Sequence, residues 1–273
     1  MKNNTPLRAA LALALAATAQ AACAVEWSDT SVGIRYGTNF AEPFIGDGIA
    51  KRIVNVTHAS GYKYGSNFFN VDFLMSDGKD DHAQEAYVVY RHTLDLGTVM
   101  DRKFEYGFVR GMGVTAGFDW NTKNDPGYGS RKRMLVLGPT LFLNTPGFLN
   151  AGIYLLYESN QPAAAHIDRY TYDLHPMLGL AWGIPIAGDS GFSFEGYLNW
   201  IAAKGTNEFG GPTAPEFNFD GAIMYDASRW VGADKGRFKV GFEYQYWRNK
   251  FGNPHSVAGS LAKTPMVRAE YHF

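Results

Sequence analysis

The sequence contains one cysteine, Cys23, in 273 residues, and this scarcity argues against a fold held together by disulfides. The formal net charge of −1 shows no global bias toward nucleic acid or an anionic surface. No Gly-rich phosphate loop, zinc-binding spacing or nucleic-acid-binding module occurs either. We therefore expect no cofactor, no resident metal and no nucleic-acid partner.

Long apolar runs are also scarce, because the chain has a single one, Ala9–Ala19. Two basic residues precede this run, and the small residues Ala22-Cys23-Ala24 follow it. The run is shorter than the roughly 18 residues that a membrane-spanning helix needs. The pattern predicts a secretory signal peptide over residues 1–24, removed by cleavage. A lipoprotein signal ending at Cys23 is a weaker alternative, because Gln20 stands where that signal has an aliphatic residue.

What the sequence does have is aromatic residues, 15% of the chain, placed in alternating segments. In the final segment, Val267, Tyr271 and Phe273 alternate with Arg268 and Glu270. The preceding segment has the same design, with Phe238, Val240, Phe242, Tyr244 and Tyr246 against Arg237, Lys239, Glu243 and Gln245. A period of two predicts strands with one apolar and one charged face. An apolar face flanked by aromatics, opposite a polar face, is typical of outer-membrane barrels.

Alternating segments separated by turn residues continue through residues 25–273, and their number is about twelve. The sequence therefore predicts an all-β protein, an antiparallel transmembrane β-barrel in the bacterial outer membrane. Thr145-Pro146-Gly147 predicts a tight hairpin turn. We expect strands over Phe104–Trp120 and Tyr170–Ile184, and a surface loop over Thr38–Ala50.

The gaps between segments give a second test of this architecture. If both termini are periplasmic, short connections alternate with long outer loops. The gaps 145–147 and 187–191 fall on the inner side, whereas 121–131, 159–168, 204–215 and 249–262 fall on the outer side. The gaps 95–103 and 226–236 are longer than this rule prefers.

Several segments resemble the Tsx-type nucleoside-specific channel family, in particular its OmpK-like branch. The resemblance covers nearly all of residues 25–273 and is carried by NVTHASGYKYGSNFFNVDF, DWNTKNDPGY, HPMLGLAWGIP, AAKGTNEFGG, EYQYWRNKFGN and TPMVRAEYHF. It implies a barrel of about twelve strands, passive uptake of nucleosides and, for some members, use as a phage receptor. The ending Tyr271-His272-Phe273 likewise resembles the signal that barrel-assembly machinery reads.

A nucleoside pore needs aromatic groups for the base and carboxylates or amides for the ribose hydroxyls. Polar residues on the charged faces of the predicted strands offer these groups. Candidate solute-binding residues are Glu195, Tyr197, Asn199, Asn218, Asp220, Glu243, Gln245, Arg268 and Glu270, with Phe68 and Trp247 as stacking partners. The alternative interpretation is that inward charges only pair with one another across a hydrated interior.

Three weaker patterns suggest other activities. Asp173 and His175 share a face and would suit an outer-membrane lipid hydrolase, but nothing fixes a serine beside them. Residues 119–125 faintly resemble a calcium loop, with a lysine where an oxygen ligand belongs. Arg131-Lys132-Arg133 is either a contact for lipopolysaccharide phosphates or a solvated basic rim. Because a surface barrel acting as phage receptor or adhesin shares this architecture, that function stays open beside the channel.

Overall fold

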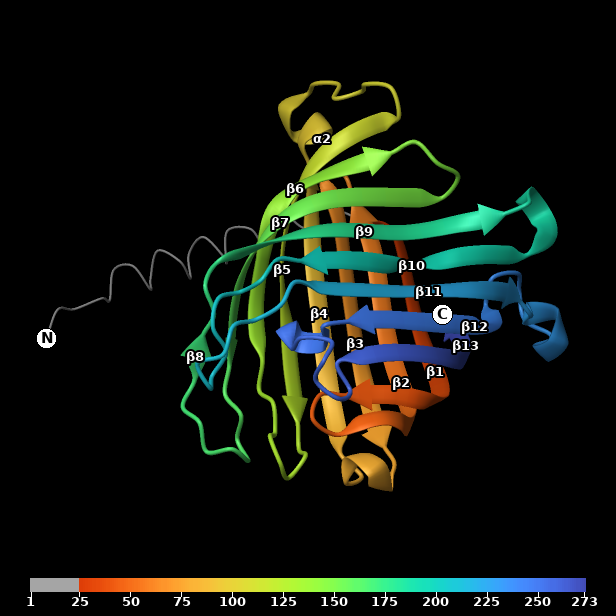
Figure 1. The fold of residues 1–273 in the computed structure, drawn as a ribbon. Helices are drawn as coiled ribbons and strands as arrows, with labels where there is room; N and C mark the ends of the chain where they lie inside the picture. Colours follow the sequence, from red (N-terminus) through yellow and green to blue (C-terminus); the bar gives the residue numbers. More distant parts are fainter. Residues whose placement is uncertain (1–24) are drawn as a thin grey trace, which may run out of the picture.

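The computed structural model describes residues 25–273, which form one antiparallel sheet closed into a barrel (Figure 1). Twelve strands make the wall, and the two-residue strand β8 adds to the end of β7. The wall strands are β1 (Val25–Glu42), β2 (Gly46–Tyr62), β3 (Gly65–Ser76), β4 (Gln84–Asp95), β5 (Val109–Lys123), β6 (Arg133–Leu143), β7 (Phe148–Asn160), β9 (His175–Ile186), β10 (Phe192–Ile201), β11 (Glu216–Asp226), β12 (Phe238–Arg248) and β13 (Leu261–His272); β8 is Tyr170–Thr171. The predicted fold class and the predicted strand number are confirmed. The predicted signal peptide lies outside the described residues.

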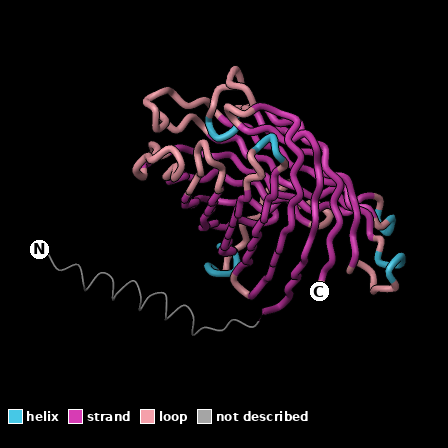
Figure 2. Tube along the Cα trace, turned by 90° about the horizontal axis from the view of Figure 1, so that it is seen from below, coloured by secondary structure: helices cyan, strands magenta, loops and turns pink. Residues whose placement is uncertain are grey.

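Helical structure is confined to the connections between strands (Figure 2). It comprises α2 (Leu96–Met100) and the 3-10 turns η1 (Gly78–Asp80), η2 (Gly188–Ser190), η3 (Ser228–Val231) and η4 (Lys250–Gly252). Within residues 25–273, none of the helices combines the length and the apolar character that crossing a membrane requires.

The barrel closes because the first and last strands pair, from Ser31 opposite His272 to Tyr36 opposite Val267. On the other side of the wall, β6 pairs with both β5 and β7. Strands β9–β12 cross in front of β3–β5 at a steep angle (Figure 1). This crossing is expected where strands on opposite walls tilt by roughly 40° from the barrel axis.

The two ends of the barrel differ in their connections. One end, which we call the terminal end, holds Val25 and Phe273 and the connections 63–64, 96–108, 144–147, 187–191 and 227–237. The opposite end, the loop end, holds the connections 43–45, 77–83, 124–132, 161–174, 202–215 and 249–260. All four gaps assigned to the outer side, 121–131, 159–168, 204–215 and 249–262, meet at the loop end. The tight turn at Thr145-Pro146-Gly147 is confirmed, with Gly147 at a φ of +71°.

The predicted loop over Thr38–Ala50 is wrong, because β1 and β2 continue as a hairpin with only residues 43–45 between them. Register shifts between Gly37 and Phe40, and between Phe40 and Glu42, interrupt the alternation. Such bulges insert an extra residue into one strand, so a period of two fails where the strand continues. Phe40 is nevertheless buried, packed with Ile49 and Ile53.

Two predicted strand starts are also wrong. Strand β5 begins at Val109 rather than at Phe104, because Gly107 adopts a φ of +54° and Tyr106 folds back to bond with Val109. The segment predicted as one strand from Tyr170 to Ile184 is divided into β8 and β9. The Asp173 amide donates instead to the carbonyl of Lys204 in the neighbouring connection.

The outward face of the barrel is apolar and exposed. Exposed outward side chains at mid-strand are Val32, Ile34, Leu135, Leu137, Ile153, Leu155, Ile223, Phe242 and Val267. Aromatic residues flank this belt, with Phe192, Tyr271 and Phe273 toward the terminal end and Trp120, Tyr157, Trp200 and Tyr244 toward the loop end. An apolar band between two aromatic girdles is the surface that a lipid bilayer contacts in membrane barrels.

Candidate functional site

The candidate functional site is the barrel interior, the lumen, where polar side chains are buried. The nine predicted residues all lie on the inward side of their strands, alternating with the outward apolar residues. Six of them are on β11, β12 and β13, where Asn218, Asp220, Glu243 and Glu270 are buried and Gln245 and Arg268 are half-buried. The structure therefore brings these residues to one compartment, and whether they bind a solute remains a prediction.

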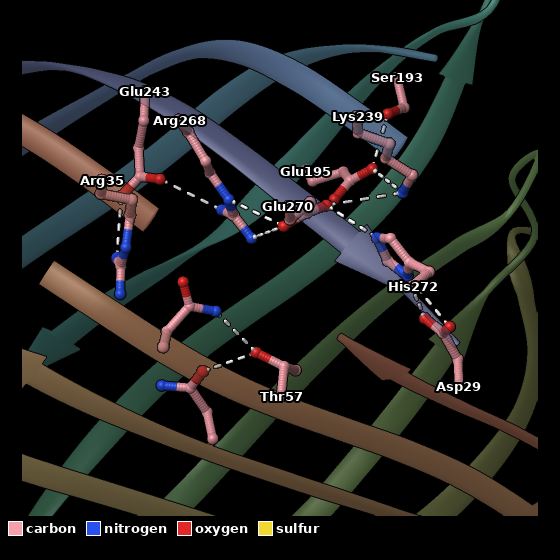
Figure 3. A network of polar contacts seen from close by, with 12 residues as sticks. Asp29, Arg35, Thr57, Ser193, Glu195, Lys239, Glu243, Arg268, Glu270 and His272 are labelled. Carbon is pink, nitrogen blue, oxygen red and sulfur yellow. Dashed lines mark hydrogen bonds and ion pairs between the residues drawn. The ribbon is translucent and has the colours of Figure 1, made fainter. Parts of the chain in front are cut away.

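An ion-pair network that we call the charged wall joins β3, β1, β12 and β13. Figure 3 shows the part of it that runs from Arg35 through Glu243 and Arg268 to Glu270. Arg35 lies at its centre, with one guanidinium nitrogen 2.5 Å from Asp72 and the other 3.0 Å from Glu243. Glu243 also pairs with Arg268 at 3.1 Å, and Arg268 pairs with Glu270 at 2.7 Å. Each charge is thus balanced by an opposite charge on a nearby strand, which buried ions require.

The network continues toward the terminal end through Glu270 (Figure 3). His272 lies 3.1 Å from Glu270 and 2.8 Å from Asp29 of β1. Lys239 pairs with Glu195 at 3.0 Å and lies 3.8 Å from Glu270. Predicted residues Glu195, Arg268 and Glu270 therefore belong to one continuous chain of paired charges along the lumen.

Amide and hydroxyl groups lie next to the charges. Thr57 donates to Asn70 at 2.8 Å, and Asn70 donates to Asp72 at 3.0 Å. On the other side, Gln245 donates to Asp220 at 3.1 Å. Asn55 Oδ1, Asn218 Oδ1 and Arg35 Nε are buried but make no hydrogen bond within residues 25–273. These two acceptors and one donor are therefore unsatisfied within the described chain.

Two aromatic side chains remain accessible inside this buried compartment. Tyr197 is 37% exposed, although its hydroxyl accepts a hydrogen bond from Asn218 Nδ2 at 3.4 Å. Phe68 is 42% exposed and lies on the same side of β3 as Asn70 and Asp72. Space therefore remains beside both rings. The predicted stacking partner Trp247 differs, because its indole donates to Glu216 at 2.8 Å and faces the Lys250 ammonium.

Buried ionic clusters lie nearer the loop end, and sequence reasoning missed most of their members. In one, Lys51 is 2.5 Å from Glu42, while Lys250 is 3.2 Å from the same carboxylate. In that cluster, Lys123 pairs with Asp80 at 2.9 Å. Glu42 falls within the predicted loop Thr38–Ala50, because the bulges of β1 interrupt the alternation there. Lys51 lies on the inward side of β2 by the same alternation that places Ile53 and Asn55 there.

A second lumen surface, which we call the hydroxyl wall, consists of Thr93, Thr115, Thr140 and Tyr154 on β4–β7. Thr115 lies 2.8 Å from the Thr93 hydroxyl and 2.6 Å from that of Thr140, and Thr140 lies 3.1 Å from the Tyr154 hydroxyl. Next to it, an apolar cluster comprises Met134, Val136, Leu156, Met177 and Ile201, with Tyr154 packed against it. The lumen therefore offers paired ions along β1, β12 and β13, and a patch of neutral groups on β4–β7.

The hydrolase pattern does not assemble into a nucleophile and base. His175 Nδ1 lies 2.7 Å from the backbone carbonyl of Asp173, not from its carboxylate. His175 Nε2 lies 3.7 Å from Glu158, which pairs with Lys204 at 2.8 Å. In the part of the chain that the structure describes, no serine hydroxyl contacts His175. This arrangement suits a structural contact at the start of β9, at the loop end.

The side chains of the faint calcium pattern at residues 119–125 also bind other protein groups. Asp119 pairs with Arg91 at 2.6 Å, and Lys123 is bound to Asp80. Asp125 accepts from the backbone amides of Tyr128 and Gly129, so its carboxylate holds the connection 124–132 together. No group of three or more potential metal ligands occurs among the described residues.

Neither a protein-family model nor a curated relative matches the sequence. Among solved structures, the translocator domain of autotransporter NalP from Neisseria meningitidis is similar, with a TM-score of 0.47 and 10% identity over 98% of this chain and 97% of that chain. The β domain of the Bordetella autotransporter BrkA gives a TM-score of 0.42 and 11% identity over 90% and 98%. Pseudomonas aeruginosa OpdK with vanillate gives 0.28 and 9% over 91% and 99%.

Proposed function

We propose that this protein is a bacterial outer-membrane barrel that lets small, uncharged polar solutes pass selectively, with nucleosides as the preferred class. The observation that carries the proposal is the contrast between an apolar exposed exterior and a lumen of paired charges that keeps Tyr197 and Phe68 accessible. The resemblance of several segments to Tsx-type channels favours nucleosides among solutes of this size.

The chemistry of the lumen suits a neutral solute. Charges of both signs are already paired there, so the lumen presents no single-sign field that would concentrate small ions. An aromatic base can stack on Tyr197 or Phe68. Ribose hydroxyls can donate to Asn55 Oδ1 and Asn218 Oδ1 once these buried side chains turn toward the solute, because neither oxygen has a partner among the described residues. A buried polar atom without a hydrogen bond costs free energy, so a solute that supplies the missing hydrogen bonds binds more tightly.

Selectivity in this proposal comes from a narrow, contacted passage. A twelve-stranded barrel lies between eight-stranded barrels filled by side chains and sixteen-stranded porins with open channels. Arg35 on β1 pairs with Asp72 on β3 and with Glu243 on β12, so these ion pairs line one side of the passage. A solute that passes here touches the charged wall and the accessible aromatics in turn.

Conductance of the purified protein in a planar bilayer tests this function, with adenosine, thymidine and a sugar of similar size added in turn. We expect nucleosides, but not the sugar, to block the ion current. Tyr197→Ala combined with Phe68→Ala should weaken the block roughly tenfold, the value of one or two stacked aromatic contacts. Tyr157→Ala, an outward tyrosine on β7, is the matched control and should leave the block unchanged. No current would refute the channel, and identical behaviour of all solutes would refute its selectivity for nucleosides.

A second candidate function is a surface receptor or adhesin, and the ordered loop end favours it. The Tyr128 hydroxyl donates to Glu208, which joins the connections 124–132 and 202–215. Tyr128 also contacts the Tyr170 hydroxyl at 3.3 Å, which adds the connection 161–174. A preformed loop surface is what a macromolecular partner such as a phage needs. Replacing residues 204–213 with a Gly/Ser linker should abolish adsorption while leaving conductance intact, if this function is separate from transport.

A further inference from the structure

Three arginines gather on the outer side of the barrel at the loop end. Arg133 opens β6 on its outward side, Arg131 lies two residues before it, and Arg169 comes from the connection 161–174. Arg169 donates to Ser159 Oγ at 3.1 Å and to the backbone carbonyl of Arg131, also at 3.1 Å. These two bonds hold the Arg169 guanidinium beside the start of β6. The grouping is therefore fixed by the fold and joins residues far apart in sequence.

The positive charge of this group is not compensated by the protein. None of the three arginines forms an ion pair within residues 25–273, and the side chains of Arg131 and Arg133 have no hydrogen-bond partner there. The neighbouring Lys132, by contrast, points inward to Glu158 at 3.8 Å. Burial lowers the pKa of Arg169, and the charges of Arg133 and Arg131 lower it further. An anion at this position would relieve that repulsion.

The surroundings of the three arginines are amphipathic. Arg131 lines a surface hollow of about 330 Å³ with His166 and Asp168, and Asp168 makes no ion pair with any arginine of the described chain. On the membrane side of Arg133, the same outward face continues with exposed Leu135 and Leu137. Aromatic and aliphatic residues flank these leucines, namely Trp120 on β5 and Leu155 and Tyr157 on β7. Charge therefore lies directly next to the apolar belt.

We propose that Arg131, Arg133 and Arg169 form a binding site for the phosphorylated headgroup of an anionic membrane glycolipid, with its acyl chains against Leu135, Leu137 and Leu155. The planar guanidinium group of arginine binds two phosphate oxygens at once. The exposed leucines beside the arginines give the acyl chains of the same lipid an apolar surface to contact. A free phosphate would use the arginines but not the leucines. The proposal rests on the membrane placement of the barrel but not on solute passage.

Native mass spectrometry of the detergent-solubilised protein with added diphosphorylated lipid A tests the site. The test variant is R131Q/R133Q/R169Q. The control variant R52Q/R248Q/K263Q removes the same charge from exposed outward residues on β2, β12 and β13. We expect the test variant to bind lipid A at least roughly tenfold more weakly, because charge-assisted hydrogen bonds are lost. The control variant should stay within about twofold of the wild type.

Equal weakening in both variants would overturn the proposal in favour of a diffuse basic rim. Unchanged binding in the test variant would also overturn it, because the three arginines would then not bind the headgroup. Dephosphorylated lipid A should bind wild type and test variant equally. Excess inorganic phosphate should not displace lipid A, and displacement at millimolar concentration would assign the site to free phosphate instead. The single variant R133Q provides the same comparison if the triple variant fails to fold, and circular dichroism monitors folding in each case.

Discussion

The charged wall and the hydroxyl wall face the same lumen but satisfy their buried polar groups in different ways. On the charged wall, Arg35 depends on Asp72 and Glu243, and each carboxylate depends on a cation from another strand. On the hydroxyl wall, Thr115 and Thr140 can each donate and accept, so the ladder is neutral and self-sufficient. Losing a member should therefore cost far more on the charged wall than on the hydroxyl wall.

The largest effect is expected from Arg35→Met. The substitution leaves the Asp72 and Glu243 carboxylates without their shared cation, and breaking a buried pair costs about 3 to 5 kcal/mol. Urea unfolding in lipid vesicles measures the free energy of unfolding. Arg52→Met, an exposed outward arginine on β2, is the matched control and should cost under about 0.5 kcal/mol.

Adding Asp72→Asn and Glu243→Gln to Arg35→Met removes the stranded negative charges. We expect this triple variant to recover most of the lost stability, because a neutral buried set costs less than an unpaired one. If Arg35→Met alone were as mild as Arg52→Met, the lumen would be too hydrated for the ion pairs to matter. The contrast between the two walls would then disappear.

The apolar cluster beside the hydroxyl wall should give the next largest effect. Leu156 is fully buried among Met134, Val136 and Met177, so Leu156→Ala leaves a cavity and should cost about 2 to 4 kcal/mol. Its sequence neighbour Leu155 points outward and is half-exposed, so Leu155→Ala should cost clearly less in the same unfolding measurement. Equal costs would mean that this part of the lumen is not packed.

A smaller effect is expected on the hydroxyl ladder itself. Thr115→Val keeps the side-chain shape but removes bonds to Thr93 and Thr140, and Thr140 retains its contact with Tyr154. We expect a loss of about 1 to 2 kcal/mol, and almost none for the outward Thr122→Val on the same strand. A loss as large as that of Arg35→Met would contradict the self-sufficiency of the ladder.

The smallest effect is a pH dependence of loop closure, in the connections 124–132 and 161–174 at the loop end. Burial raises the pKa of Tyr128, and so does its hydrogen bond to Glu208; burial also raises the pKa of Tyr170. The closed loops therefore hold these protons more tightly than open loops do. The stability that these two tyrosines give to the closed loops is fully present below about pH 10, the pKa of an unperturbed tyrosine, and it falls as the pH rises above that value.

Protease cleavage within residues 161–174, measured between pH 8 and pH 11, tests this prediction. Cleavage should stay constant up to about pH 10 and accelerate above it, since each ionised tyrosine weakens loop closure by up to about 1 kcal/mol. In the Tyr128→Phe/Tyr170→Phe variant, cleavage should no longer depend on these hydroxyls. Acceleration already at pH 8 would point to a different titrating group.

The same two walls show what the sequence could predict. Alternation identified the inward side of β10–β13, because Glu243 and Arg268 stand opposite in parity to apolar neighbours such as Phe242 and Val267. It could not identify partners, since Arg35 meets Glu243 only after the barrel closes. The neutral ladder gave no signal, because a lone threonine such as Thr115 is common on any strand. Local periodicity specifies faces, whereas pairing depends on strand order and stagger.

The seam between β1 and β13 has a consequence for how the barrel is made. It joins residues more than 200 positions apart, as His272 and Asp29 show with a separation of 243. Contacts at such separation form late and slowly, because the intervening chain must first be ordered. Until β13 is in place, the growing wall has two unpaired edges that can recruit strands of other chains. A chain shortened before Leu261 should therefore aggregate rather than form a smaller barrel.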